Sequence, residues 1–165
     1  MDAYSYKRLS APIRKSKRSI ELLRIVNLVL TGLVYIAYPA LMLYLLIFKR
    51  ELFLRSLIVP GSMFLFVSGL RKVLDRPRPY EALQIRPLLV KEKQGESMPS
   101  RHIFSVFIIA MTFMYVFGVG AAIPFFVIGV VMALIRVVGG VHFPSDVLVG
   151  AAIGIISGIL GFYII

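Results

Sequence analysis

The sequence predicts an all-α membrane protein: a bundle of five transmembrane helices with an amphipathic surface helix at its N-terminal end. Two features of composition predict this class. Of the 165 residues, 59% are hydrophobic and only 16% are charged, whereas soluble domains are nearer half apolar and a quarter charged. The apolar residues also gather in long uncharged stretches, and about 20 such residues cross a ~30 Å hydrocarbon core. Because no repeat divides the chain, we expect one membrane-embedded domain over residues 1–165.

Residues 1–24 form a polar, basic interfacial segment. Residues on one side of a helix recur at spacings of three and four, namely Leu9, Ile13, Ser16, Ile20 and Leu23. Most of the cations fall on the other side, which is typical of a helix lying on a membrane surface. Pro12 suits the first turn of such a helix, so we expect it to start there and end near Arg24. The alternative is that this segment is a basic arm that binds nucleic acid. Because the chain as a whole is so apolar, a lipid surface is the favoured partner.

Two spans and a polar connection follow. Residues 25–48 carry no charge, residues 49–51 form a charged turn, and residues 52–74 form the second span. Residues 75–98 are rich in proline and charge. The next uncharged stretch, 103–135, is too long for one helix across the hydrocarbon core.

Three helix breakers interrupt that stretch, namely Gly118, Gly120 and Pro124. We therefore expect spans at 99–117 and 121–138, and a last span at 144–165. The last span carries small residues four apart, Gly150, Gly154 and Gly158, followed by Gly161. Such residues let helices approach closely, either inside the monomer or across a dimer face. The oligomeric state stays open.

Alternating spans bring four helix ends to one face of the membrane. The second span ends near Arg71, the third begins near His102, the fourth ends near Arg136 and the fifth begins after His142. Both histidines of the chain therefore meet two arginines there. An arginine within a span is costly, which makes it a functional candidate.

The first polar segment runs from Arg71 to Pro79. Prolines stiffen the exit of the helix, so that Arg78 can fold back toward Arg71. Two guanidinium groups held in this way bind a phosphate in a bidentate manner. The alternative is a cluster of cations that stops the span at the membrane surface.

The second segment is Ser97-Met-Pro99-Ser100-Arg101-His102. Ser97 suits a helix N-cap and Pro99 the first helical position. The free N–H groups of Ser100 to His102 would then face an anion. The alternative is an ordinary helix start.

The third segment joins Arg136 to His142 and Asp146. Pro144 opens the last helix, which leaves His142 just outside it and Asp146 in its first turn. A hydrogen bond from the His142 ring to the Asp146 carboxylate would fix the tautomer of His142 and free its other ring nitrogen for nucleophilic attack. A purely structural histidine is the alternative.

Two histidines and an aspartate could also bind a metal ion. Four arginines surround them, namely Arg71, Arg78, Arg101 and Arg136. Their charge repels a cation and favours an oxyanion, so we expect no metal and no cofactor. A net charge of +11 likewise indicates an anionic partner. The absence of cysteine excludes a thiol nucleophile.

These segments resemble the three motifs of the type 2 phosphatidic acid phosphatase and vanadium haloperoxidase superfamily, in its small membrane lipid phosphatase branch. The first motif matches Arg71 and Arg78-Pro79, the second Pro99-Ser100-Arg101-His102, and the third Arg136, His142 and Asp146. Three positions depart from the pattern. Arg71 stands in place of lysine, and Lys72 can share its role. Arg101 replaces glycine and can add a substrate contact, and Ile135 replaces serine.

The resemblance implies metal-independent hydrolysis of a lipid phosphomonoester or pyrophosphate through a phosphohistidine. It implies that His142 is the nucleophile, that Asp146 orients it and that His102 protonates the leaving oxygen. Phosphate oxygens would be held by Arg71, Arg78, Ser100 and Arg136, and residues 80–98 would form a loop over the site. The expected partners are a lipid phosphate and membrane lipids, with no nucleic acid. A nonenzymatic lipid-binding protein and a small transporter are the alternatives.

The charge distribution and the resemblance disagree on which face carries the site. Only Lys49, Arg50 and Arg55 lie on the opposite side from the histidines. The positive-inside rule therefore predicts a cytoplasmic site. The resemblance implies the outer face of the plasma membrane. Both orientations stay open, and in either one the N-terminus and residues 80–98 are expected on the same side.

Overall fold

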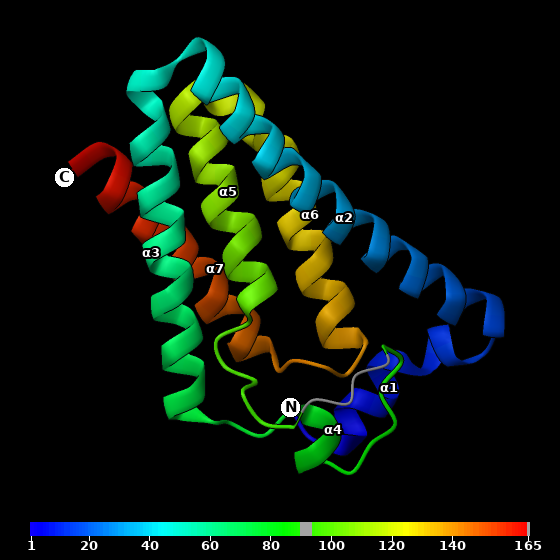
Figure 1. Cartoon of the computed structure of the whole chain (residues 1–165). Helices are drawn as coiled ribbons and strands as arrows, with labels where there is room; N and C mark the ends of the chain where they lie inside the picture. The colour runs from blue at the N-terminus through cyan, green and yellow to red at the C-terminus, as the bar shows by residue number, and fades with distance from the viewer. Residues whose placement is uncertain (90–93, 165) are drawn as a thin grey trace.

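The computed structural model describes residues 1–89 and 94–164, and the regular structure of these residues is helical throughout (Figure 1). In chain order the elements are α1 (Ala3–Arg14), α2 (Lys17–Phe48), α3 (Arg50–Leu74), α4 (Pro79–Ala82), α5 (Arg101–Phe117), α6 (Val119–Val138), α7 (Pro144–Ile159) and the π-helix η1 (Leu160–Ile164). The predicted all-α class is confirmed.

The described residues form four apolar helices of spanning length and one shorter apolar helix, so the predicted count of five spans is not confirmed. Among the described residues, α2, α3, α6 and α7 are long and apolar enough to cross a membrane. The fifth, α5, has 17 residues, a length of ~26 Å. It starts later than predicted because residues 97–100 form an extended loop, and it ends at Gly118, whose φ is +86°.

The N-terminal segment corrects one prediction. A single surface helix from Pro12 to Arg24 is wrong, since α1 ends at Arg14 and α2 begins at Lys17. Asp2 caps α1 by accepting a hydrogen bond from the Ser5 N–H at 2.8 Å. Ser16 is extended and occupies the N-cap position of α2 without a side-chain hydrogen bond, which separates the two helices. Pro12 lies inside α1.

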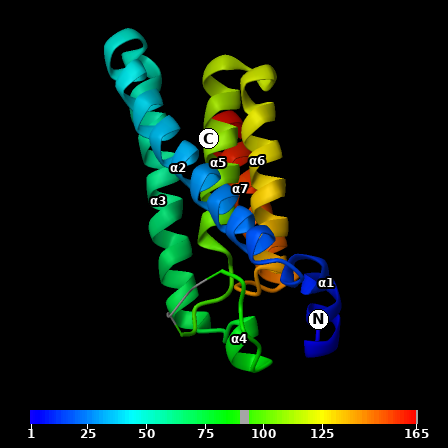
Figure 2. The same ribbon diagram turned by 90° about the vertical axis from the view of Figure 1, so that its right-hand side faces the viewer.

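Helix α5 is the centre of the bundle, between α3 and α6 and against α7 (Figures 1 and 2). The glycines of α7 make this packing close. A methyl group on Gly154 or Gly158 would lie 2.9 or 2.4 Å from an atom of α5, and one on Gly150 would lie 2.7 Å from the carbonyl oxygen of Ser100, the N-cap of α5. Close packing inside the monomer is thus confirmed for these three positions. Gly161 instead faces Val59 of α3.

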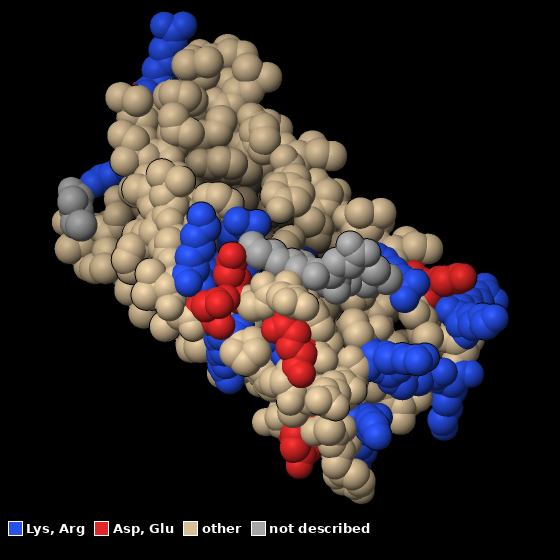
Figure 3. Space-filling view, turned by 60° about the horizontal axis from the view of Figure 1, so that its bottom comes forward, with Lys and Arg blue, Asp and Glu red and all other residues tan. Residues whose placement is uncertain are grey.

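One end of the bundle collects the polar segments. The C-terminal ends of α3 and α6 and the N-terminal ends of α5 and α7 lie there, together with α4 and the N-terminus (Figure 1). The predicted convergence of four helix ends is therefore confirmed. Seen from this end, Lys and Arg side chains gather over α1 and the first turns of α2, at the right of the view (Figure 3).

Candidate active site

The turn between α6 and α7 brings His142 back over the end of α6. The chain leaves α6 through Gly139 and Gly140, and Gly140 has a φ of +74° that suits glycine. The N–H groups of Val141 and His142 then both donate to the Arg136 carbonyl, at 3.2 and 3.3 Å. His142 and Arg136 are buried, with exposures of 1% and 4%. The fold therefore joins two of the predicted site residues through the backbone.

Helix α7 begins as predicted. Pro144 is its first residue, and Asp146 lies in its first turn. The Asp146 carboxylate reaches back and accepts a hydrogen bond from the Phe143 N–H at 2.8 Å. Its Oδ2 lies 3.7 Å from His142 Nδ1, which is an ion-pair distance rather than a hydrogen bond.

Ser97 lies between these two side chains. Its hydroxyl donates to Asp146 Oδ2 at 2.5 Å and lies 3.5 Å from His142 Nδ1. Its predicted role as a helix cap is wrong, because Ser100 is the N-cap of α5. The backbone explains why: the Ser97 N–H donates to the Arg76 carbonyl at 2.9 Å, which holds this segment extended.

The prediction that the Ser100 N–H faces an anion is also wrong. This group donates to the Asp146 carbonyl at 2.8 Å. The contact joins the start of α5 to the start of α7, which pack closely at Gly150. The Ser100 hydroxyl is left as the polar group of this residue that can meet a ligand.

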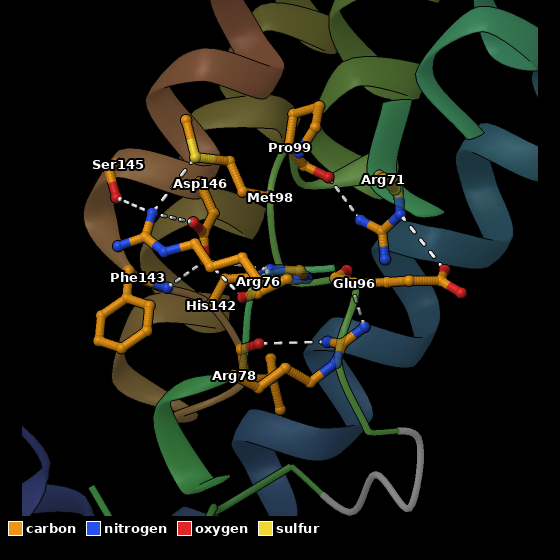
Figure 4. Close-up of polar contacts among 12 residues, drawn as sticks. Arg71, Arg76, Arg78, Glu96, Met98, Pro99, His142, Phe143, Ser145 and Asp146 are labelled. Atoms are coloured by element: carbon orange, nitrogen blue, oxygen red, sulfur yellow. Dashed lines mark hydrogen bonds and ion pairs between the residues drawn. The ribbon is translucent and has the colours of Figure 1, made fainter. Parts of the chain in front are cut away.

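Arg76 is a site residue that the sequence analysis did not identify. Its Nη1 donates to Asp146 Oδ1 and to Ser145 Oγ, both at 2.8 Å (Figure 4). Its guanidinium also covers the Phe143 ring, 4.8 Å from the centroid. The Asp146 carboxylate thus accepts from the Arg76 guanidinium at Oδ1 and from the Ser97 hydroxyl at Oδ2. In the sequence nothing separates Arg76 from its neighbouring arginines, because its partners lie about 70 residues away.

Arg71 and Arg78 lie on the other side of the site from Arg76 (Figure 4). Arg71 Nη1 donates to the Pro99 carbonyl, and its Nε lies 3.9 Å from Glu96 Oε2. Arg78 is 1% exposed and donates to backbone carbonyls of Gly95, Glu96 and Val141. Besides its predicted contact with phosphate, Arg78 therefore joins the polar loop to the turn before His142.

Glu81 fixes the polar loop at its base. Its carboxylate accepts from the Arg78 N–H at 2.8 Å and from the Gly95 N–H at 2.9 Å. It thereby closes the described parts of the loop predicted at 80–98, whose residues 90–93 lie outside the described residues. Glu81 is not among the residues predicted for the site from the sequence.

Three buried polar atoms of the predicted phosphate ligands have no hydrogen-bond partner. Within the described part of the chain, these atoms are Arg71 Nε, Arg136 Nε and Ser100 Oγ. A buried donor without a partner is unfavourable by about 1–3 kcal/mol, more when it is charged. Two come from guanidinium groups, so an anion with several acceptor oxygens is the ligand that satisfies them best.

The remaining candidates differ in their surroundings. Lys72 and Arg101 are exposed, and the Arg101 guanidinium lies 5.3 Å from the Phe64 ring centroid. Neither side chain shares the burial of the other predicted phosphate ligands. His102 is half-buried in the first turn of α5 and lines a narrow cavity beside Tyr35 and Ser105. Across residues 1–89 and 94–164, no group of three His, Cys, Asp or Glu gathers as a metal site would.

Comparison with known proteins identifies the family. The model of the PAP2 superfamily matches residues 52–165, a range that contains all three polar segments. The chain belongs to the PAP2 superfamily. Its several apolar helices make it a multi-pass membrane protein, and as a PAP2 phosphatase it is an enzyme that hydrolyses phosphate esters.

Two solved structures are similar to the chain. Aquifex aeolicus LpxE is 24% identical with a TM-score of 0.75, over 97% of this chain and 93% of that one. A Bacillus subtilis transmembrane PAP2-type phosphatidylglycerolphosphate phosphatase is 23% identical with a TM-score of 0.47, over 96% and 90%. The first likeness supports the fold. No curated protein matches the chain.

Proposed function

We propose that this protein is a metal-independent lipid phosphatase of the plasma membrane, which hydrolyses a lipid phosphomonoester or pyrophosphate through a phosphohistidine at His142. The observation that carries the proposal is the set of buried atoms on Arg71, Ser100 and Arg136 that make no hydrogen bond. A phosphoryl group offers oxygens to all three. Fixed cations around those oxygens stabilise the charge of the transition state, the role that Mg²⁺ has in other phosphoryl transfers.

The proposed reaction has two steps. Because His142 Nδ1 faces Asp146 and Ser97, its Nε2 is the nitrogen that attacks phosphorus. The bond from phosphorus to the lipid oxygen breaks, and that oxygen takes a proton from His102. Water then attacks the phosphohistidine and loses a proton to His102, which restores the protonated form of that residue, and the bond from phosphorus to Nε2 breaks to release phosphate and free His142. Atoms and charge balance without a metal or a cofactor.

An apolar groove between α2, α3 and α5 supports a substrate with hydrocarbon chains. It has a volume of about 270 Å³ and is lined by residues such as Tyr38, Pro60 and Gly61. It shares Tyr35 and Ser105 with the narrow cavity beside His102. Helices α2 and α3 separate toward the active-site end (Figure 2). A lipid chain in this groove would extend toward the proposed general acid.

Phosphate release by the purified protein in detergent with EDTA tests the proposal. The substrate panel is phosphatidic acid, phosphatidylglycerophosphate, a polyprenyl phosphate and pyrophosphate, and a lipid A-type glycolipid. We expect release from at least one of them in EDTA. Release from none, or release only after a divalent cation is added, would contradict the proposal.

We expect His102→Ala to slow hydrolysis of a lipid alkyl phosphate by about 10²–10⁴-fold, the range of general acid catalysis. A p-nitrophenyl phosphate should lose far less, because its phenolate leaves without a proton. The measurement is kcat for both substrates with wild type and variant. Equal losses for both would show that His102 is not the general acid.

We expect Gly61→Leu to lower kcat/KM for a long-chain lipid phosphate by about tenfold, while a short-chain soluble analogue is hydrolysed as before. Gly61 lines the groove and a Cβ atom there meets nothing within 4 Å, so the leucine side chain would extend into the space of the groove. Gly69→Leu is the matched control, because Gly69 lies on the same helix with equally open space. Equal behaviour of the two variants would exclude this groove as the chain site.

A further inference from the structure

Tyr6 is fully buried although it lies close to the N-terminus on a short helix. Its exposure is 0%, whereas Tyr4 on the same helix is 73% exposed. Helix α1 also contacts α2 and α6, so it is docked on the active-site end of the bundle. A helix that only lay on the membrane would present its apolar side chains to lipid. Burial of Tyr6 inside the protein calls for a different explanation.

The Tyr6 ring lies directly against Gly140, in the turn between α6 and α7. A methyl group on Gly140 would lie 2.4 Å from Tyr6 Oη and 2.7 Å from Cζ. Only glycine lets the backbone at position 140 come this close to the Tyr6 ring. The φ of +74° at this position also favours glycine. The ring therefore forms one wall of the turn that ends at His142.

A polar network fixes the orientation of that ring. Tyr6 Oη accepts a hydrogen bond from Arg14 Nη2 at 3.2 Å, and the same nitrogen donates to the Arg86 carbonyl. Arg14 Nε donates to Ser10 Oγ at 3.0 Å, and the buried Ser10 hydroxyl donates to the Tyr6 carbonyl at 2.9 Å. The arginine thus ties the tyrosine to both its own helix and the polar loop.

Two other contacts hold the turn from different directions. The Gly139 carbonyl accepts from the Leu88 N–H at 2.9 Å, and the Val141 carbonyl accepts from Arg78 Nη1 at 3.2 Å. Between these two, Tyr6 covers Gly140. The turn leads within two residues to His142, so a shift of the turn moves the imidazole. Displacements of about 1 Å at a reacting group cost on the order of 10²-fold in rate.

We propose that Tyr6 is a positioning residue for hydrolysis: from helix α1 it holds the Gly139–His142 turn, and through it the imidazole of His142. The inference rests on the proposed function, because it takes His142 as the reacting group. It makes α1 part of the active-site structure. Arg71 and Ser100 lie outside the turn, so loss of Tyr6 should affect the chemical step more than substrate binding.

The test compares Tyr6→Ala, Tyr6→Phe and the exposed control Tyr4→Ala in the full-length protein in detergent. Turnover of a lipid phosphate gives kcat and KM, and hydrogen exchange of the segment 139–143 reports on the turn. We expect Tyr6→Ala to lose at least about tenfold in kcat with KM within about threefold. Exchange at Val141 and His142 should rise, since both amides donate to Arg136 in the wild type. Tyr6→Phe keeps the ring but lacks the hydrogen bond from Arg14, so it should lose much less than Tyr6→Ala in both readouts. Tyr4→Ala should match wild type.

Gly140→Ala tests the same contact from the turn and does not depend on the folding of Tyr6→Ala. Its methyl group would push against the ring, so kcat should fall and exchange of the turn should rise. The inference is overturned if Tyr6→Ala keeps wild-type kcat, if Tyr6→Phe fails as badly as Tyr6→Ala, or if Gly140→Ala changes neither readout. Hydrogen exchange is measured independently of catalysis, so the two failures can be told apart. An inactive wild type would count against the proposed function. Unchanged exchange of the turn in Tyr6→Ala would count against the Tyr6 contact.

Discussion

His142→Ala is expected to abolish phosphate release, to less than about a hundredth of the wild-type rate. The proposed nucleophile, His142, is buried, with 1% exposure. The other histidine, His102, lies on helix α5. Water entering the space of the imidazole would lack the covalent route that divides the reaction into two easier steps. The measurement is phosphate release from the best lipid of the panel, with acid-labile phosphoenzyme trapped from radiolabelled substrate.

The control for this variant is Leu148→Ala on α7, the helix that begins two residues after His142. Leu148 is 68% exposed on the bundle surface, and its loss should leave both turnover and trapping unchanged. His142→Ala should keep the thermal stability and gel-filtration behaviour of wild type, because cavity effects from one imidazole in a loop are local. Residual activity above a hundredth, from folded protein, would rule out the phosphohistidine.

The second large effect is expected for Asp146→Asn, a loss of about 10²–10⁴-fold in kcat, as for the aspartate of other histidine-based sites. Asp146 is fully buried and accepts from the Phe143 N–H, Ser97 Oγ and Arg76 Nη1. An asparagine has only one acceptor oxygen for donors that approach from two sides. Its amide group must face either the Arg76 cation or the Phe143 N–H, so the network breaks and His142 loses its orienting charge.

Glu51→Gln is the matched control for removal of one carboxylate charge. Glu51 is exposed in the first turn of α3, at the opposite end of the bundle. We expect it to keep wild-type kcat and KM. The measurement is kcat and KM of both variants and of wild type for a lipid phosphate. For Asp146→Asn we expect a KM within about threefold of the wild-type value. If Asp146→Asn keeps more than a tenth of wild-type kcat, the carboxylate does not orient the nucleophile.

Much of the arrangement could be predicted because it depends on local chemistry. Uncharged stretches become helices in a bilayer, since every backbone polar group must be satisfied within the segment. Their alternation brings Arg71, His102, Arg136 and His142 to one end. Pro144 starts α7 and sets the distance from His142 to Asp146, as predicted. The length of α5 was less predictable, because residues 97–100 prefer contacts with α7 and the polar loop over another helical turn.

What only the tertiary structure decided is which polar groups meet. Ser97 fits a helix cap by its local sequence, yet its hydroxyl binds Asp146, 49 residues away. Arg76 looks like its neighbours until the fold turns it toward α7. Tyr6 belongs to the basic segment 1–24, which the local pattern assigns to the membrane surface, and its ring packs against Gly140. The physical reason is common to all three: a buried polar or aromatic group takes the partner that the packing of distant segments provides, and the pattern of one segment carries no information about that partner.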